Sequence, residues 1–389
     1  MPKYFLILLL FLNLSVYSQE SSVEFKTDIG FFNNNINAEL LFQSFGFLDE
    51  TEKYNILNVL KSKNNIAFEM NNSFRYKNSK EWGLSLSNNV GAYATYSKSL
   101  AQLILLGNTP FKGENLKLDP IDITAFNYTQ LKFLYKWNKK IETNVGLILG
   151  HHLLNANVNK GYFYTDSQAS FINYELDYEA HFTNSIDLRQ NPYSNNGYGA
   201  SFGMRYKESI DKGSIQITIS DIGFINWNKK TTNIYIKNQY EFEGIYVDNF
   251  INFNDSIIRN EIDSLQYNLQ VNTKESFIWK IPTRLSLKIN QSLNSSFIQT
   301  YSITMDHRIN LYNTPRFAIE ISKKIKKHNM TLGYHIGGVE HIGFQFKYFY
   351  LGEKNQLYIC TKQFNFGIPS LSYGLHVGIG IKRVFSRTN

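Results

Sequence analysis

The chain has only one cysteine, Cys360, and 7 prolines in its 389 residues. A single cysteine cannot form a disulfide within the chain, so backbone hydrogen bonds and packing must hold the fold together. Beyond the N-terminal 20 residues, no continuous apolar run approaches the length of about 18 residues that a membrane-spanning helix needs. The sequence therefore predicts neither a disulfide framework nor a transmembrane helix after the N-terminus.

Motifs for catalysis and metal binding are also missing. The sequence contains no H-E-x-x-H, Walker, EF-hand or G-x-S-x-G pattern. His151 and His152 are adjacent, so on a strand they would point to opposite faces. His335, His341 and His376 could approach one another on neighbouring strands, but their simplest interpretation is as polar-face residues. We expect no enzymatic activity, no metal site and no cofactor.

The formal net charge is +8, which raises the question of nucleic-acid binding. Lys and Arg are scattered over alternate positions and turns, and no helix or recognition motif concentrates them. The sequence therefore predicts no nucleic-acid partner. Basic turns are instead suited to contact anionic outer-membrane lipid or lipopolysaccharide.

The N-terminus is typical of a secretory signal peptide. Lys3 precedes the apolar run 4–12, and Val16-Tyr17-Ser18 supplies small residues at the positions that cleavage requires. We expect cleavage after Ser18, which gives a signal peptide over residues 1–18 and a single domain over residues 19–389. The run is too short to span a bilayer.

Aromatic residues, by contrast, are abundant at 15%, and apolar residues alternate with small or polar ones. The clearest example is LSYGLHVGIGI, residues 371–381, in which every second residue from Leu371 to Ile381 is apolar. A strand has period two, so one face is apolar over about 11 residues, the length that crosses a bilayer at a tilt. The pattern predicts a lipid-facing side and a lumen-facing side.

The same alternation recurs in 13 to 17 candidate strands, which favours an even-numbered barrel of about 14 strands. Short and long connections also tend to alternate, as they do in barrels with short periplasmic turns and long external loops. The short connections are 77–81, 138–140, 211–213, 290–295 and 323–329, and the long ones are 48–65, 91–125, 155–197 and 246–275. We predict an all-β, transmembrane antiparallel β-barrel, because a closed barrel pairs all its backbone groups in lipid.

Two segments break the alternation. Residues 97–106 suit a short helix that a serine caps and Gly107 ends, and residues 255–270 carry apolar side chains at helical spacing. Two interpretations remain open: the helices lie in the lumen as a plug or gate, or they belong to loops at the rim.

The segment 220–245 is the most distinctive. Asp221, Gly223, Phe224 and Trp227 precede an Asn-Lys-Lys turn, and the next strand ends near Gly244. Gly223 would let the strand bend or approach another backbone closely, and Trp227 suits an anchor at the membrane interface. A ligand-contact patch is the alternative to this structural role.

The D-I-G-F-I-x-W pattern at 221–227 and the F-E-G element at 242–244 resemble a Bacteroidota outer-membrane β-barrel family of unassigned function. GNTPFKG at 107–113 and W-K-I-P-T at 279–283, which contains Pro282, add to the resemblance. In length and predicted helices the chain is loosely similar to fatty-acid-transporter-like barrels and to barrel subunits of the Bacteroidota secretion machinery. The resemblance implies an outer-membrane location and brings no catalytic residue or cofactor.

Three functions remain open from the sequence. The first is a pore or transporter for small, including hydrophobic, solutes. The second is a non-conducting scaffold or partner for secretion, surface attachment or envelope assembly, and the third is a soluble β-sandwich that binds glycans. Phe385, near the C-terminus, resembles the signal that the barrel assembly machinery recognises.

Overall fold

The computed structural model describes residues 21–385, except 44–45, 79–80, 184–192, 243–270, 294, 296, 312–313 and 365–367. The predicted signal peptide, the predicted helix at 255–270 and Gly244 lie outside the described residues. Within the described part, no helix has the length and apolar character to cross a membrane.

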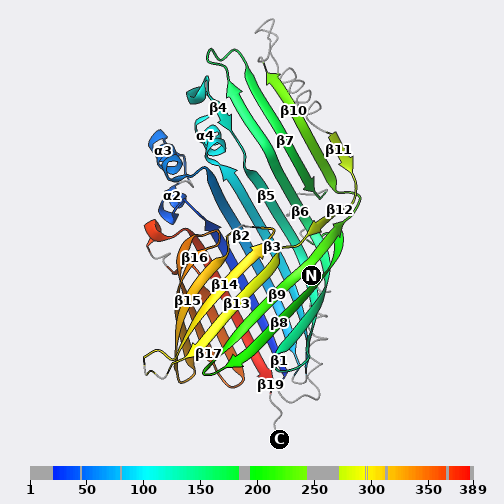
Figure 1. Cartoon of the computed structure of the whole chain (residues 1–389), viewed down its shortest axis with the longest axis vertical. Coiled ribbons are helices and arrows are strands. Elements are labelled where there is room, and N and C mark those ends of the chain that lie inside the picture. Colours follow the sequence, from blue (N-terminus) through cyan, green and yellow to red (C-terminus); the bar gives the residue numbers. More distant parts are fainter. Residues whose placement is uncertain are drawn as a thin grey trace.

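Fourteen antiparallel strands form a closed barrel, as predicted (Figure 1). In order around the ring these are β1 (Ser21–Asn33), β2 (Lys63–Lys77), β3 (Trp82–Ser97), β5 (Ile121–Lys136), β6 (Ile141–Thr165), β8 (Gly197–Ile210), β9 (Gly213–Trp227), β13 (Thr283–Ser292), β14 (Thr300–Ile309), β15 (Arg316–Ile325), β16 (His328–Gly337), β17 (Ile342–Leu351), β18 (Asn355–Thr361) and β19 (Gly374–Phe385). The ring closes where β19 pairs with β1, with Phe25 opposite Ile381. Closure removes the open edges that lipid could not hydrogen-bond.

The alternation in the last strand separates lipid-facing from lumen-facing residues. Leu375, Val377, Ile379 and Ile381 are exposed on the outer face, whereas Gly374, His376, Gly378 and Gly380 are buried inside. The strand begins at Gly374 rather than at Leu371, because Pro369 starts a short 3-10 turn, η4 (Pro369–Leu371). The apolar, lipid-facing side of this strand is therefore shorter than the sequence pattern indicates.

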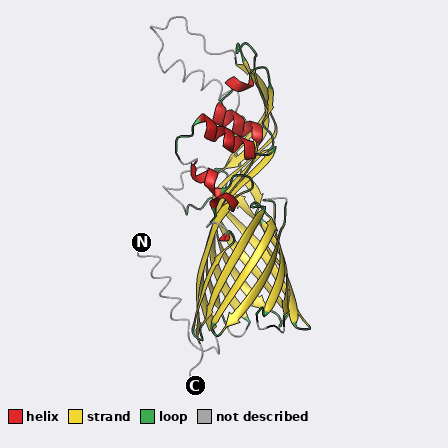
Figure 2. Cartoon of the chain, turned by 90° about the vertical axis from the view of Figure 1, so that its left-hand side faces the viewer, coloured by secondary structure: helices red, strands yellow, loops and turns green. Residues whose placement is uncertain are grey.

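One side of the barrel continues upward as a sheet that we call the wing (Figures 1 and 2). The lower part of β6, residues 141–150, pairs with β8, and its upper part, residues 154–165, pairs with β7 (Ile172–Phe182). The wing also contains β4 (Asn115–Lys117), β10 (Thr232–Phe242) and β11 (Val271–Lys274), while β12 (Phe277–Lys280) pairs with the end of β9. Two segments predicted as long loops contain regular structure instead, and that prediction was wrong: the described part of 155–197 is mostly strand, and 91–125 contains residues of three strands, the helix 98–106 and a 3-10 turn.

The helices lie beside the wing, above the barrel (Figure 2). They are α2 (Ala38–Gln43), α3 (Glu50–Val59) and α4 (Lys98–Leu106), with a 3-10 turn η1 (Thr109–Phe111) after α4. The predicted helix α4 begins at its Ser97 cap and packs on β3 and β4, so it is not a lumenal plug. Helix α3 falls in a segment predicted as a loop, although Asp49 and Glu52 form a capping box there.

Candidate functional site: the barrel lumen and its mouth

The distinctive motif of β9 builds a bulge that aims a carboxylate into the lumen. Asp221 has a positive φ of 63°, and the pairing of β9 with β8 shifts register beside it. Its Oδ1 accepts a hydrogen bond from Nε2 of Gln130 at 3.0 Å and lies 2.8 Å from Nζ of Lys132. Asp221 therefore belongs to the polar lining of the lumen.

The other residues of the motif separate to the two faces of β9. Phe224 is exposed on the outer face, while Gly223 points inward, where a Cβ would lie 2.3 Å from the carbonyl oxygen of Ala200. Trp227, the last residue of β9, is fully buried in a hydrophobic cluster, which contradicts the prediction of an anchor at the membrane interface, because such an anchor faces lipid.

Two further predicted residues lie away from the motif. Pro282 is buried between β12 and β13, immediately after Ile281, whose N–H donates to the carbonyl of Gly223. Phe385 is the last residue of β19, where the guanidinium of Arg383 lies over its ring at 5.6 Å. Pro282 as part of a family motif and Phe385 as an assembly signal both stay predictions.

An aromatic layer closes the upper lumen. Its buried members, which form one cluster, are Phe32, Ala67, Tyr93, Phe126, Tyr128, Ile148, Leu153, Ile225, Trp227, Trp279, Ile281 and Val339. Trp279 and Phe126 have ring centroids 5.2 Å apart. Trp279, Ile281 and Val339 come from β12, from the segment after it and from the β16–β17 connection, not from the barrel wall. We call the aromatic layer the seal. The part of the seal that these three residues form can move without breaking the strand pairing of the barrel wall.

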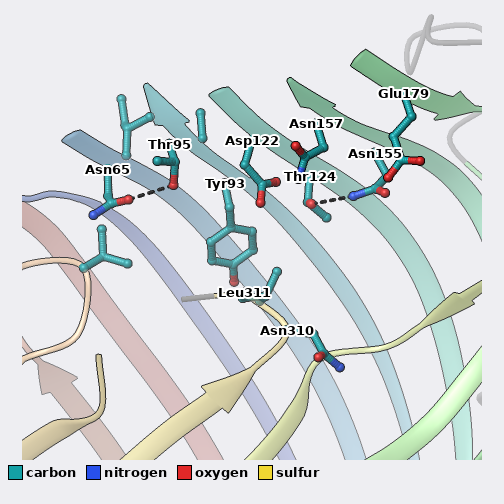
Figure 3. A pocket seen from close by; sticks show the side chains of 13 residues that line it. Asn65, Tyr93, Thr95, Asp122, Thr124, Asn155, Asn157, Glu179, Asn310 and Leu311 are labelled. Atoms are coloured by element: carbon teal, nitrogen blue, oxygen red, sulfur yellow. Dashed lines mark hydrogen bonds between the residues drawn. The ribbon is translucent and has the colours of Figure 1, made fainter. Parts of the chain in front are cut away.

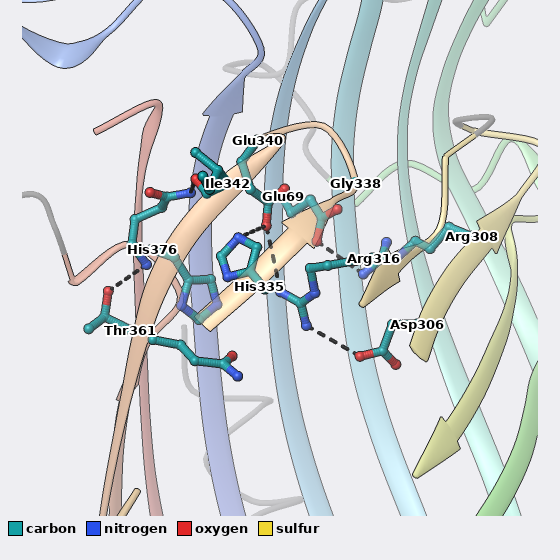
Figure 4. Close-up of polar contacts among 12 residues, drawn as sticks. Glu69, Asp306, Arg308, Arg316, His335, Gly338, Glu340, Ile342, Thr361 and His376 are labelled. Carbon is teal, nitrogen blue, oxygen red and sulfur yellow. Dashed lines mark hydrogen bonds and ion pairs between the residues drawn. The ribbon is translucent and has the colours of Figure 1, made fainter. Parts of the chain in front are cut away.

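Below this layer, one arginine reaches across the barrel (Figure 4). Arg308 on β14 lies halfway around the ring from Glu69 on β2, yet its Nη2 is 3.0 Å from Oε2 of Glu69. Its Nη1 donates to Oη of Tyr93 at 3.2 Å, and that hydroxyl donates to Oε1 of Glu69 at 3.0 Å. We call Arg308, Glu69 and Tyr93 the latch. Because charge-assisted hydrogen bonds are strong where water is scarce, the latch ties opposite walls together.

A second ionic network continues from the latch along the wall. Asp306 is 3.0 Å from Arg284 and 3.3 Å from Arg316, and Arg316 is 3.6 Å from Glu340. Nε2 of His335 lies 3.3 Å from Glu340 (Figure 4). Asp306, Arg316 and Glu340 are largely shielded from solvent and are paired, which is the condition under which a protein interior tolerates charges, whereas Arg284 is half-exposed.

At the end of the barrel with the short turns, the lumen contains a cavity of about 480 Å³. Basic side chains outnumber acidic ones in its lining, where Lys26, Arg75 and Lys382 face Glu24. Tyr358 and Phe349 add aromatic surface. The lumen is thus open and basic near the short turns, and closed near the wing.

On the other side of the aromatic layer, the inner face of the wing carries a polar pocket of about 120 Å³ (Figure 3). Except for Tyr93 and Asn310, its polar residues come from β2, β3, β5, β6 and β7 and form a shelf above the closed mouth. They are Asn65, Thr95, Asp122, Thr124, Asn155, Asn157 and Glu179. Tyr93 and Val339 line this pocket and also belong to the aromatic layer, so the pocket adjoins the seal directly.

The histidines divide among these regions. His151 and His152 are buried where β6 exchanges its neighbour β8 for β7, and Nδ1 of His151 lies 2.9 Å from the carbonyl of Ser194. His335 and His376 point into the lumen (Figure 4), whereas His341 is exposed, so the three do not form one group. The latch cannot be seen in the sequence, because Arg308 and Glu69 are 239 residues apart and meet only through the order of the strands.

A family model described as "Family of unknown function (DUF5723)" matches residues 15–355, which takes in the wing and the strands from β1 to β17. The chain belongs to this family. The membership agrees with the resemblance to a barrel family of unassigned function; a Bacteroidota origin and the role of D-I-G-F-I-x-W as a family motif stay predictions. No curated protein matches the chain.

Solved structures of outer-membrane barrels resemble the chain in fold. The Ralstonia pickettii toluene transporter TbuX has 8% identity and a TM-score of 0.39, with 96% of this chain and 90% of that chain covered. A Pseudomonas aeruginosa FadL homologue has 10% identity and a TM-score of 0.41, with 95% and 90% covered. The translocator domain of the autotransporter NalP from Neisseria meningitidis has 6% identity and a TM-score of 0.35, with 98% and 95% covered. Likeness at this level concerns the fold and says nothing of a solute.

Proposed function

We propose that this barrel is an outer-membrane channel for small polar solutes, held closed in this structure by the latch and the aromatic layer. The observation that carries the proposal is a polar lumen interrupted near one end by a seal. Part of that seal comes from segments outside the wall. Such a seal can open while the hydrogen-bond ladder of the barrel stays intact.

The lining of the lumen favours polar over hydrophobic solutes. Below the aromatic layer, the inward positions carry charged and amide side chains such as Lys26, Gln130, Asp221, Asp306 and Glu320. An apolar solute would gain no burial there and would displace hydrating water from charged groups. The excess of basic side chains at the cavity near the short turns favours anions.

Conductance of Arg308→Ala in a planar bilayer tests the proposal. Removing a charge-assisted hydrogen-bonding partner costs roughly 1.5–3 kcal/mol, so we expect the ratio of open to closed channels to rise about tenfold to a hundredfold. Arg205→Ala is the matched control, because Arg205 pairs with Glu142 on the neighbouring strand, 2.6 Å away, and does not cross the lumen.

Two outcomes separate the channel from a non-conducting scaffold. Frequent openings in Arg308→Ala but not in Arg205→Ala support the channel. If inserted Arg308→Ala protein is as silent as the wild type, the channel proposal fails. The scaffold would then gain support, since the polar shelf on the wing offers a surface for a secretion or envelope partner.

A further inference from the structure

Three side chains that can bind a metal ion converge inside the barrel, on strands other than those that carry the latch. Asp28 on β1 and Cys360 on β18 are both register partners of Gly378, which lies on β19 between them. His376 is the next inward residue of β19 toward the mouth. Oδ1 of Asp28 lies 3.8 Å from Nε2 of His376 and 3.9 Å from Sγ of Cys360. Potential ligand atoms of all three residues lie within 4.8 Å of one another.

The glycine between the two outer strands makes this convergence possible. A Cβ at position 378 would lie 2.4 Å from Oδ1 of Asp28 and 2.6 Å from Sγ of Cys360. Side chains on two strands that are not neighbours therefore meet over the missing side chain of the middle strand. Sequence spacing does not reveal the group, because Asp28 and Cys360 are 332 residues apart.

The imidazole of His376 provides an independent indication of a ligand. Its exposed fraction is 3%, its Nδ1 has no hydrogen-bond partner, and its Nε2 is too far from Asp28 for a hydrogen bond. A buried polar side chain without such partners is costly and calls for an explanation such as a bound ion or water. Nζ of Lys26 holds the other oxygen of Asp28, Oδ2, at 2.7 Å and leaves Oδ1 facing the histidine and the cysteine.

We propose that Asp28, Cys360 and His376 bind one divalent transition-metal ion of the Zn²⁺ class. Thiolate, imidazole and carboxylate are its usual ligands, with bonds of about 2.0–2.3 Å, so small side-chain rotations bring the three atoms into range. The thiol loses its proton to solvent as the sulfur–metal bond forms. Three protein ligands leave a fourth position for a water molecule or a solute from the lumen. The proposal does not depend on conduction.

Binding of Co²⁺ to the folded full-length protein in detergent, after removal of metal with a chelator, tests this proposal. Cys360 is the only cysteine, so a thiolate-to-cobalt charge-transfer band reports on this position alone. We expect one ion per chain, displacement by Zn²⁺ and loss of the band in Cys360→Ser. His376→Ala should weaken binding by at least about tenfold. Gly378→Ala should weaken it similarly while keeping all three ligands.

His307→Ala is the matched control. This histidine also lies in the barrel and has a buried Nδ1 without a hydrogen-bond partner, but it is not part of the cysteine-containing group. Heat-modifiable migration on gels identifies the variants that fold. Absence of the band in the folded wild type, or its persistence in Cys360→Ser, would overturn the metal site. Either result leaves the conductance test of the latch unaffected.

Discussion

The barrel wall and the wing use the same two-faced strands in different surroundings. In the barrel, Leu131, Leu147 and Phe224 lie in one row across β5, β6 and β9 and are exposed on the outer face. In the wing, two adjacent rows cross β5, β6, β7 and β10. One row is Ile121, Val158, Tyr178 and Ile236; the other is Asp122, Asn157, Glu179 and Tyr235. Apolar and polar rows therefore still alternate on the strands above the barrel. There the apolar face lies outside the lipid and must be covered by protein.

The two regions differ in what covers the apolar face of their strands. Part of the apolar side of the wing packs under α3 and α4, where Leu57, Leu60 and Ala101 form a small buried cluster that Tyr96 of β3 joins. The outer face of the barrel has no such cover in the described part of the chain and is suited to lipid. β6 belongs to both regions, and a bulge that leaves His151 unpaired shifts its alternation by one residue where the strand passes from the barrel to the wing.

The largest effect is expected at the junction of the two regions, in Trp227→Ala. Trp227 is fully buried, and a Cβ at Gly150 on β6 would lie 2.7 Å from its ring. Emptying this site should lower the free energy of unfolding by about 3–5 kcal/mol, measured by urea titration of vesicle-folded protein. Trp227→Phe keeps a ring and removes an indole N–H that has no partner, so it should cost less. Equal losses would show that the junction is not tightly packed.

A charge on the outer face of the barrel should have the next largest effect. Ile319 has an exposed fraction of 59% near the middle of β15, where an arginine in lipid costs roughly 2–4 kcal/mol. Ile319→Arg should therefore lower the stability measured in the same titration. Tyr235→Arg, at an exposed position of the wing, should change it by less than about 1 kcal/mol. Similar losses for both variants would contradict the difference in surroundings.

The barrel could be predicted from the sequence because its signal is local. Each strand shows both faces within about ten residues, so Val377 and His376 are assigned without knowledge of the neighbouring strands. The wing was missed because β6 exchanges β8 for β7 beside a bulge at His151, which shifts the alternation by one residue, and neither the bulge nor the new partner can be read from the local sequence pattern. Helix α3 could have been found, since Asp49 and Glu52 have the spacing of a capping box.

The functional arrangement could be predicted only in part. Inward positions such as Glu69 and Arg308 follow from alternation, but their contact depends on strand order and on the tilt of the barrel. The same holds for Asp28 and Cys360, which meet only because Gly378 lies between them. Trp227 was assigned to the wrong surroundings, because an aromatic residue near the end of a strand is typical both of the membrane interface and of a buried cluster at the mouth of a barrel.

The smallest effect tests whether the wing and the barrel unfold separately. Oγ of Ser97 accepts from the N–H of Leu100 at 3.1 Å and donates to the carbonyl of Leu118 at 2.7 Å, so it joins α4 to the segment after β4. Ser97→Ala should lower the free energy of local unfolding of α4 and the segment after β4 by about 1–2 kcal/mol. Because α4 covers only the wing, proteolysis and amide exchange should increase in residues 98–120 while the heat-modifiable migration of the barrel stays unchanged. A matching loss of barrel stability would mean that β3, which runs from the barrel wall to Ser97, makes the two regions one cooperative unit.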